Sequence, residues 1–393
     1  MELMDVVHLL CDALVSRRIL PLLQSLDLAG VEQRYVVPKA VLNGQSTNLT
    51  PADLESHGVV AIPEIPARTR LVIAHSLFGH SARRIAQYRG DAHIAWAMWG
   101  GDYVWMIRDQ EDESYMLPRS RALMPKFSPK HPRSFRKRIR KVAKAVLRRD
   151  ERTFTLKALA RIDTFLTVLE DDYKQVLITR GLDPAQSRRL PFTYYAVADQ
   201  ISLPPKNGTI QVGHSAALHQ NHVDVLHTLA GLGMTNRPIL CPLSYGNATY
   251  ADHVEAEGRA LFGDSFSALR TFLPLEKYRS ILRASSVAIF GNSRQEGFGN
   301  VTDLLFGGTH VVLRKENPAY DYFTELGFVL SDVETFYRRV RRDPGAPLDL
   351  PKAAQVRNHE LAHSLFSQSA IQQAYCKMVA ECLEKYAPRR GRQ

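Results

Sequence analysis

The sequence predicts an α/β protein made of two parallel-sheet domains in series. Short apolar runs such as residues 70–75 and 287–290 alternate with longer stretches whose apolar residues recur at helical spacing. This alternation is typical of βαβ units, in which a helix connects two parallel strands. It stops at SLPPKNG, residues 202–208, where two prolines and an Asn-Gly pair predict a linker, and then it resumes.

The individual elements follow from where each apolar pattern begins and ends. In the first half we expect strands at residues 5–10, 33–38, 58–63, 70–75 and 93–100, and helices at residues 15–26, 81–89 and 161–181. In the second half we expect strands at residues 209–215, 237–243, 287–291 and 310–314, and helices at residues 221–233, 247–263, 273–286 and 355–386, with another helix starting at residues 303–308. We therefore expect a first domain over residues 1–200, a second over residues 209–360, and a closing helix over residues 361–393 that packs back on the first domain.

The composition favours a folded cytosolic protein. Apolar residues make up 45% of the 393 residues, which supplies ample core and argues against wholesale disorder. No apolar run approaches the roughly 18 residues that a membrane span needs. Glu2 and Asp5 precede the first apolar run, where a secretory signal would carry positive charge. The four cysteines are scattered, without the spacing of a zinc site or a disulfide framework.

The positive charge is concentrated in one segment. Arg119–Arg149 contains 13 Lys or Arg and no Asp or Glu, so the rest of the chain is close to neutral despite a net charge of +11. Apolar residues recur at helical spacing from Phe135 to Leu147. A basic amphipathic helix can lie on an anionic membrane surface, gaining about 1 kcal/mol for each Lys or Arg near it. The alternatives are a solvated surface helix and a nucleic-acid patch. We favour the anionic membrane surface and expect no nucleic-acid partner.

Three loops of the second half follow expected strands and precede expected helices. They cover residues 213–215, 242–246 and 292–300. Ligands of parallel α/β sheets bind beyond the carboxyl ends of the strands, where helix N-termini attract phosphate and glycine permits close backbone approach. A single Gly-x-Gly often marks only a tight turn, but three such loops favour a nucleotide site. Its candidate residues are Gly213, His214, Ser215, Pro242, Ser244, Tyr245, Asn292, Ser293, Arg294, Gln295, Glu296, Gly297, Gly299, Asn300, Asp303, Glu316 and Asn317.

Several pieces of the chain occur in the same order in a known family. They are VIAHSLFGH and AMWGGD in the first half, and VGHSAALHQNHVDVLHTL, ILCPLSYGNATYADHVEAEGRALFG, LPLEKYRSILRAS, SRQEGFGN and VVLRKENPAYDYF in the second. Together they resemble the bacterial family 56 glycosyltransferases, the TDP-4-acetamido-4,6-dideoxygalactose transferases that build lipid-linked polysaccharide repeats. The resemblance implies a GT-B fold, in which two Rossmann-like domains face each other across a cleft and the second binds the donor.

Two parts of the donor site keep alternatives open. In the wider GT-B pattern a second acid follows Glu-Gly-Phe-Gly, and Asp303 stands one position short of it. Asp303 therefore either contacts the ribose or caps a helix N-terminus. Glu316 and Asn317 either face the same cleft or belong to an ordinary strand-end turn set by Pro318.

The first half offers candidates for acceptor chemistry in the piece Trp99-Gly100-Gly101-Asp102. A carboxylate at a strand end, among aromatic residues and glycines, can act as general base on a sugar hydroxyl, so Asp102 is the candidate catalytic residue. His75, His80 and Trp99 are candidates for binding the acceptor. The alternatives are structural: a tryptophan core, with Asp102 as a turn or cap residue.

We expect neither a metal nor a cofactor. Glu170 to Asp172 resembles an Asp-x-Asp metal motif, but it lies inside a helical pattern and is read as a solvated helix face. Without a metal, the leaving diphosphate needs N–H groups and cations. Arg294, Arg314 and Lys315 are the candidate cations.

Together with the family resemblance, these observations predict a metal-independent glycosyltransferase of bacterial surface polysaccharide synthesis. It would move a deoxyamino-sugar or related sugar from a TDP- or UDP-linked donor to a lipid-linked saccharide, and would lie peripherally on the cytoplasmic face of the inner membrane. Asp102 would be the base if the reaction inverts the anomeric centre. A nucleotide-sugar epimerase of the same fold and a non-catalytic basic binding protein are the alternatives.

Overall fold

The computed structural model describes residues 4–11, 14–77, 79–107, 113–127, 152–199 and 202–384. The chain divides into two compact units. The first unit comprises Met1–Asp109, Pro132–Tyr194 and Ile371–Gln393, and the second comprises Gln110–His131 and Tyr195–Ala370. Residues 128–149 of the basic segment, and with them the expected amphipathic helix, lie outside the described residues.

The first unit is a seven-stranded parallel sheet in the order β3-β2-β1-β4-β5-β6-β7. Side chains alternate between its faces, so that Val6 and Ile73 enter one apolar cluster while Val7 and Val72 enter the other. Its elements are β1 (Met4–Leu9), α1 (Leu14–Gln24), β2 (Val31–Val36), α2 (Lys39–Leu42), α3 (Pro51–Ser56), β3 (Ala61–Ile62), β4 (Leu71–Ala74), α4 (Gly79–Gln87), β5 (His93–Ala97), α5 (Gly100–Ile107), β6 (Thr164–Leu166), α8 (Glu170–Arg180), η2 (Pro184–Gln186), β7 (Arg188–Leu190) and most of α16 (Gln368–Glu384).

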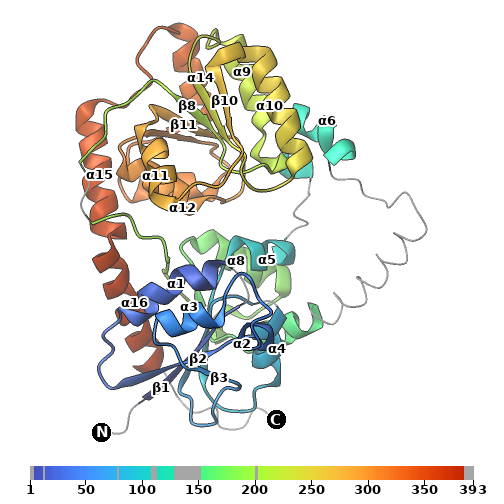
Figure 1. The fold of residues 1–393 in the computed structure, drawn as a ribbon, viewed down its shortest axis with the longest axis vertical. Helices are drawn as coiled ribbons and strands as arrows, with labels where there is room; N and C mark the ends of the chain where they lie inside the picture. The colour runs from blue at the N-terminus through green and yellow to red at the C-terminus, as the bar shows by residue number, and fades with distance from the viewer. Residues whose placement is uncertain are drawn as a thin grey trace. The chain divides into compact units, whose positions relative to one another are not determined.

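The second unit contains a parallel sheet, of which β8, β10 and β11 are labelled in Figure 1. Its six strands follow the order β10-β9-β8-β11-β12-β13. In the centre of this sheet Val287 of β11 pairs with Ile210 of β8 on one side and with His310 of β12 on the other. Its elements are η1 (Glu113–Tyr115), α6 (Pro118–Phe127), β8 (Ile210–Val212), η3 (Leu218–Gln220), α9 (His222–Gly231), β9 (Ile239–Pro242), α10 (Ala248–Phe262), η4 (Gly263–Ser265), β10 (Phe266–Leu269), α11 (Leu275–Ala284), β11 (Val287–Phe290), α12 (Phe298–Phe306), β12 (His310–Leu313), α13 (Pro318–Glu325), β13 (Ser331–Asp332), α14 (Val333–Arg342) and α15 (Lys352–Phe366).

The two parallel-sheet units confirm the predicted fold class, but three predicted helices differ, and strands β7, β10 and β13 were not expected. Residues 161–181 are not one helix, because the buried, β-branched and aromatic Thr164–Leu166 forms β6 and the helix begins at Glu170. The edge strand β10 was not expected; only its first residue is buried. The last helix is broken at Ser367, where the Phe366 carbonyl accepts from Val197 N at 2.7 Å. Helix α12 begins five residues earlier than the lower bound expected, at Phe298.

A segment from the middle of the chain belongs to the second unit. Helix α6 lies beside α9 (Figure 1), and Met124 and Phe127 are buried in the apolar core of this unit. Asp224 of α9 accepts from the N–H groups of Arg119 at 2.9 Å and Ser120 at 2.8 Å, and from the Ser120 hydroxyl at 2.7 Å. Those N–H groups have no partner within their own helix, so a carboxylate from α9 caps α6.

Removing this cap should cost stability. Asp224→Ala leaves three donors without a charged acceptor, and we expect the free energy of unfolding to fall by about 2–4 kcal/mol. Urea unfolding of the purified chain measures it. Asp252→Ala on α10 is the control, because it removes only a part-exposed ion pair with Arg270 and should cost less than about 1 kcal/mol. Equal costs for the two variants would contradict the capping role of Asp224.

Candidate functional site

The strand order of the second sheet locates its ligand-binding edge. Numbered along the chain within the unit, the strands follow the doubly wound order 3-2-1-4-5-6, which reverses direction between β8 and β11. In such sheets ligands bind beyond the carboxyl ends of the strands at this switch point. The loop after β8 begins at Gly213, and the loop after β11 runs from Gly291 to Gly297. Both carry residues predicted to bind the donor.

The loop after β8 brings two buried histidines to this edge. Gly213 has φ +64°, and a Cβ there would lie 2.6 Å from His222 Nε2, so the position requires glycine for conformation and for space. Ser215 and the His214 ring are buried. Burial lowers the pKa of His214 to about 4 and the pKa of His222 to about 3. Both rings are therefore neutral at physiological pH.

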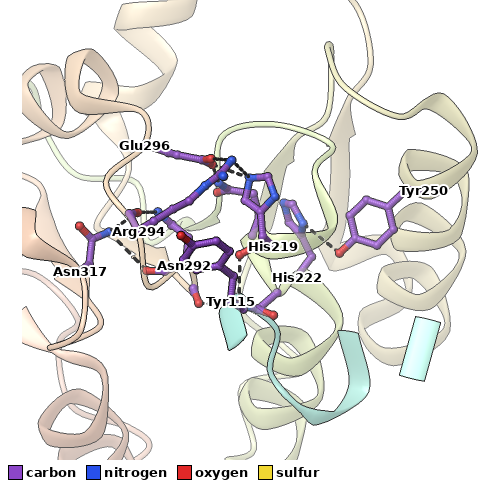
Figure 2. Close-up of polar contacts among 11 residues, drawn as sticks. Tyr115, His219, His222, Tyr250, Asn292, Arg294, Glu296 and Asn317 are labelled. Carbon is purple, nitrogen blue, oxygen red and sulfur yellow. Dashed lines mark hydrogen bonds and ion pairs between the residues drawn. The ribbon is translucent and has the colours of Figure 1, made fainter. Parts of the chain in front are cut away.

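Glu296 is the centre of a polar cluster that joins the two loops (Figure 2). Its Oε2 accepts from Gln220 Nε2 at 2.6 Å and lies 2.7 Å from His219 Nε2, and its Oε1 pairs with Arg294. Burial alone would raise the pKa of Glu296, but the neighbouring His219 and Arg294 outweigh it and lower the pKa to about 2. Glu296 is thus an anion at any physiological pH.

Arg294 has donors that its neighbours do not use. Its Nη2 lies 3.1 Å from His219 Nε2, and its guanidinium carbon stands 5.4 Å from the centre of the Tyr115 ring. Among the described residues, its buried Nε and Nη1 have no hydrogen-bond partner. Leaving charged donors buried and unpaired is costly, so this side chain favours an anionic ligand.

Two asparagines fix the backbone of the same loop (Figure 2). Asn292 Nδ2 donates to the Arg294 carbonyl at 2.6 Å, and Asn317 Nδ2 donates to that carbonyl at 3.0 Å. Asn317 Oδ1 also caps α13 by accepting from Ala319 N at 3.0 Å, with Pro318 in the first helical position. Glu316 beside it is exposed and pairs with Arg314 Nε at 3.0 Å.

The glycines before and within α12 are packed closely against aromatic rings. Gly297 is the N-cap residue with φ +65°, and a Cβ there would lie 2.9 Å from His214 Nδ1. A Cβ on Gly299 would lie 2.3 Å from Cδ1 of Tyr195. These contacts are a sufficient reason for glycine at both positions, and the predicted approach of their N–H groups to a diphosphate stays a prediction. Ser293, Gln295 and Asn300 are partly exposed in the same stretch.

The loop after β9 is held to the loop after β8. Pro242 is buried at the end of β9, and Ser244 is partly exposed. The Tyr245 carbonyl accepts from Ala216 N at 2.7 Å. The exposed Tyr245 ring has its centre 6.3 Å from that of His214. The structure therefore brings the predicted residues of all three loops to one edge of the sheet.

Asp303 lies deeper in α12 than expected. Its carboxylate accepts from Arg279 Nε at 2.9 Å and from Arg283 Nη2 at 2.5 Å, which ties α12 to α11. The alternative that Asp303 caps a helix N-terminus is wrong, because α12 begins at Phe298 with Gly297 as its N-cap residue. Its contact with a ribose stays a prediction.

In the first unit Asp102 is fully buried in the first turn of α5. Its Oδ2 accepts from Leu77 N and from Trp96 Nε1, both at 2.9 Å, and its Oδ1 accepts from Trp99 N at 2.9 Å. Burial raises the pKa of Asp102 to about 7, against the lowering effect of these donors. The carboxylate thus holds together the ends of β4 and β5.

Two of the three predicted acceptor residues meet at one tyrosine. His75 Nδ1 is hydrogen-bonded to the Tyr194 hydroxyl, and its Nε2 lies 3.1 Å from His8 Nδ1. The Trp99 ring stacks on Tyr194 with centres 5.1 Å apart. His80 stands on α4, where burial lowers its pKa to about 4. Contact of these residues with an acceptor stays a prediction.

Several residues of the site were not singled out from the sequence. His219 and Gln220 contact Glu296, Tyr115 faces Arg294, Tyr195 covers Gly299, and Tyr194 joins His75 to Trp99. The piece VGHSAALHQNHVDV carries His219 and Gln220, so two polar residues just before an expected helix were a usable signal. For Tyr115 no signal was available, because it comes from the other half of the chain.

Two further observations concern metals and membranes. Across the ranges that the structure describes, no group of three or more His, Cys, Asp or Glu is placed to hold a metal ion. Glu170 to Asp172 form the first turn of α8. Among the helices in the same ranges, none has both the length and the apolar character to cross a membrane.

Comparison with solved structures identifies the fold. A glycosyltransferase from Rickettsia africae ESF-5 matches with a TM-score of 0.61 at 10% identity, over 98% of this chain and 100% of that one. Sucrose-phosphate synthase from Thermosynechococcus elongatus matches at 0.57 and 10% identity, over 97% and 99% of the two chains. Anabaena HepE in complex with UDP and glucose matches at 0.56 and 10% identity, over 96% and 100%. These likenesses confirm the GT-B fold.

A family model adds the activity. Residues 191–337 match the model described as 4-alpha-L-fucosyltransferase glycosyl transferase group 56. This stretch includes the loops after β8, β9, β11 and β12, which carry the candidate donor site. The part of the chain that carries the candidate donor site is thus similar to glycosyltransferase group 56, and together with the solved structures this match supports a nucleotide-sugar-dependent glycosyltransferase of GT-B fold.

Proposed function

We propose that this glycosyltransferase binds the diphosphate of its donor at the carboxyl edge of the second sheet, where the loops after β8 and β11 meet. The observation that carries the proposal is Arg294. Its buried Nε and Nη1 have no partner among the described residues, and it stands at the switch point of the strand order. A diphosphate oxygen would satisfy these donors with charge-assisted hydrogen bonds.

The leaving diphosphate gains negative charge as the glycosidic bond breaks. Preorganised donors aimed at that charge lower the barrier without a metal. Arg294 supplies the guanidinium. Asn292 and Asn317 hold the backbone carbonyl of Arg294, so the side chain needs little reorganisation. Helix α12 adds the partial positive charge of its N-terminus. Glu296, anionic in the same cluster, would accept further hydrogen bonds from sugar hydroxyls.

For the donor we propose a deoxyhexose or deoxyamino-sugar linked to TDP or UDP. The matched family is described as a fucosyltransferase, and fucose is a 6-deoxyhexose. Anabaena HepE, which shares the fold, holds UDP and glucose. The acceptor we propose is a lipid-linked saccharide of bacterial surface polysaccharide synthesis. Mass spectrometry of products from matched TDP- and UDP-sugars tests the donor, and the proposal fails if no deoxy-sugar is transferred.

The diphosphate proposal predicts the effect of removing Arg294. Arg294→Ala should weaken binding of UDP or TDP about 10–100-fold, since charged hydrogen bonds contribute about 1.5–3 kcal/mol. Isothermal titration calorimetry measures the nucleotide affinity. The affinity of Arg294→Lys should fall between those of the wild type and Arg294→Ala. Arg259→Ala on the exposed face of α10 is the control, and its affinity should be unchanged. A folded Arg294→Ala chain with normal nucleotide affinity would overturn the proposal.

We also propose Asp102 as the catalytic base. A pKa of about 7 suits proton abstraction near neutral pH. The carboxylate has no exposed surface here, so reaching an acceptor hydroxyl requires the turn Trp99-Gly100-Gly101 to move. Gly100 and Gly101 have open space where a Cβ would lie, which leaves room for that movement.

A base with this pKa predicts both a rate and a pH profile. Asp102→Asn should lower turnover about 10²–10⁴-fold and leave donor affinity intact. In the wild-type enzyme kcat/KM should fall as pH drops below about 7, because the base becomes protonated, and this limb should vanish in the variant. A structural role gives another result: a lower melting temperature, with normal turnover and pH profile per folded molecule. That result would remove Asp102 from the mechanism.

Membrane attachment through Arg119–Arg149 is a separate proposal, supported by its 13 cations without an anion. Binding to phosphatidylglycerol vesicles should be strong at low salt and should fall as salt rises, because exposed charges are screened within about 10 Å at 0.1 M. Co-sedimentation measures it, with phosphatidylcholine vesicles as the control. Equal binding to both lipids would show that charge does not drive attachment.

A further inference from the structure

The segment that carries Tyr115 is anchored in the second unit at both of its ends. At its far end Met124 and Phe127 enter the apolar core. At its near end Asn221 holds the backbone, with Oδ1 accepting from Leu117 N at 2.8 Å and Nδ2 donating to the Tyr115 carbonyl at 3.1 Å. The position of Tyr115 is therefore set by the second unit, although the segment follows α5 of the first unit in the sequence.

The same asparagine joins this segment to the loops of the donor site. Asn221 Nδ2 also lies within hydrogen-bonding distance of the carbonyls of Gly291 at 2.8 Å and His219 at 3.1 Å. Asn221 has φ 56°, the one non-glycine residue with positive φ among the residues the structure describes. A left-handed backbone at a non-glycine residue is held only where its surroundings determine it. One fully buried side chain thus fixes Tyr115, His219 and the loop after β11 relative to each other.

Within this arrangement the Tyr115 ring faces the guanidinium of Arg294. The guanidinium carbon lies 5.4 Å from the ring centre, inside the range of a cation–π contact (Figure 2). Glu296 and His219 contact the Nη2 end of the group. The ring and these polar neighbours together restrict the guanidinium, and its Nε and Nη1 are left unpartnered among the described residues.

We propose that Tyr115 is a positioning residue for donor binding, which orients Arg294 toward the diphosphate. The inference rests on the proposed function of Arg294. It makes the donor site a product of both halves of the chain: residues 191–337 match the family model, and Tyr115 comes from outside them. The contribution is the face of the ring, because that is what meets the guanidinium.

The test compares an aromatic ring with an aliphatic side chain at position 115. Tyr115→Leu should weaken UDP and TDP binding about threefold to thirtyfold, the range that follows from a part-buried cation–π contact. Tyr115→Phe keeps the ring and should bind within about twofold of the wild type. In turnover assays Tyr115→Leu should raise the donor KM and leave kcat at saturating donor close to normal. Calorimetry and steady-state kinetics on the full chain provide both readouts.

Two controls separate positioning from loss of structure. Val340→Ala, in the same apolar core but on α14, should lower the melting temperature and leave nucleotide affinity per folded molecule unchanged. In an Arg294→Ala background, adding Tyr115→Leu should not weaken binding further, because the group that the ring orients is gone.

The outcomes distinguish the two proposals. If Arg294→Ala binds nucleotide normally, the proposed function of Arg294 fails and the inference fails with it. If Arg294→Ala weakens binding but Tyr115→Leu does not, the inference alone is overturned. It is also overturned if Phe and Leu at position 115 weaken binding equally, or if Tyr115→Leu weakens binding as much without Arg294 as with it.

Discussion

The donor edge of the second unit depends on a partly buried pair of opposite charges, Glu296 and Arg294. Burying either charge alone would cost several kcal/mol, so neither is tolerated without the other and without further donors. Gln220 and His219 supply such donors to the carboxylate, and both come from the loop after β8, whereas the pair stands in the loop after β11. Satisfying the pair therefore requires the two loops to meet. The need of this ion pair for hydrogen-bond donors therefore holds the two loops together at the edge of the sheet where we propose that the donor binds.

The helices around this edge are stabilised in a way that serves the site as well. Asn317 caps α13 and also donates to the Arg294 carbonyl, so the start of one helix and the shape of the donor loop are not independent. Asn221 has a similar double role between the loop after β11 and the segment before α6. Asp303 ties α12 to α11 through two arginines, which holds the helix that follows the donor loop. Substitutions at these positions would change stability and binding together.

Much of the fold was predictable because the spacing of apolar residues and the residue types at strand ends can be read from short stretches of sequence. The central strands β4, β8, β11 and β12 are short buried apolar runs, and all were expected close to where they lie. Strand β10, one of the strands that were not expected, has one buried residue at its start, so its sequence carries little alternation. Residues 161–181 were wrongly predicted as one helix, because apolar residues on both sides of Thr164–Leu166 continue a helical spacing. Packing beside β5 selects the strand there, and packing is not visible in a local window.

The candidate site was predictable in its position, but not in its contacts. Parallel topology sends every strand's carboxyl end to the same edge, so loops far apart in sequence were correctly expected together. What each glycine does there was not predictable, since Gly213, Gly297 and Gly299 all face aromatic rings that only the folded chain brings close. Tyr115 marks the limit most clearly. It stands 179 positions before Arg294, in a stretch that a contiguous domain boundary assigns to the other unit. The apolar residues of α6 are few and lie among basic residues, so the local sequence pattern does not indicate a buried helix. Met124 and Phe127 are nevertheless buried in the core of the second unit. The role of Tyr115 can therefore be found only from the contacts of the folded protein. Its ring faces the positive charge of Arg294, which is the physical reason for an aromatic residue at this position.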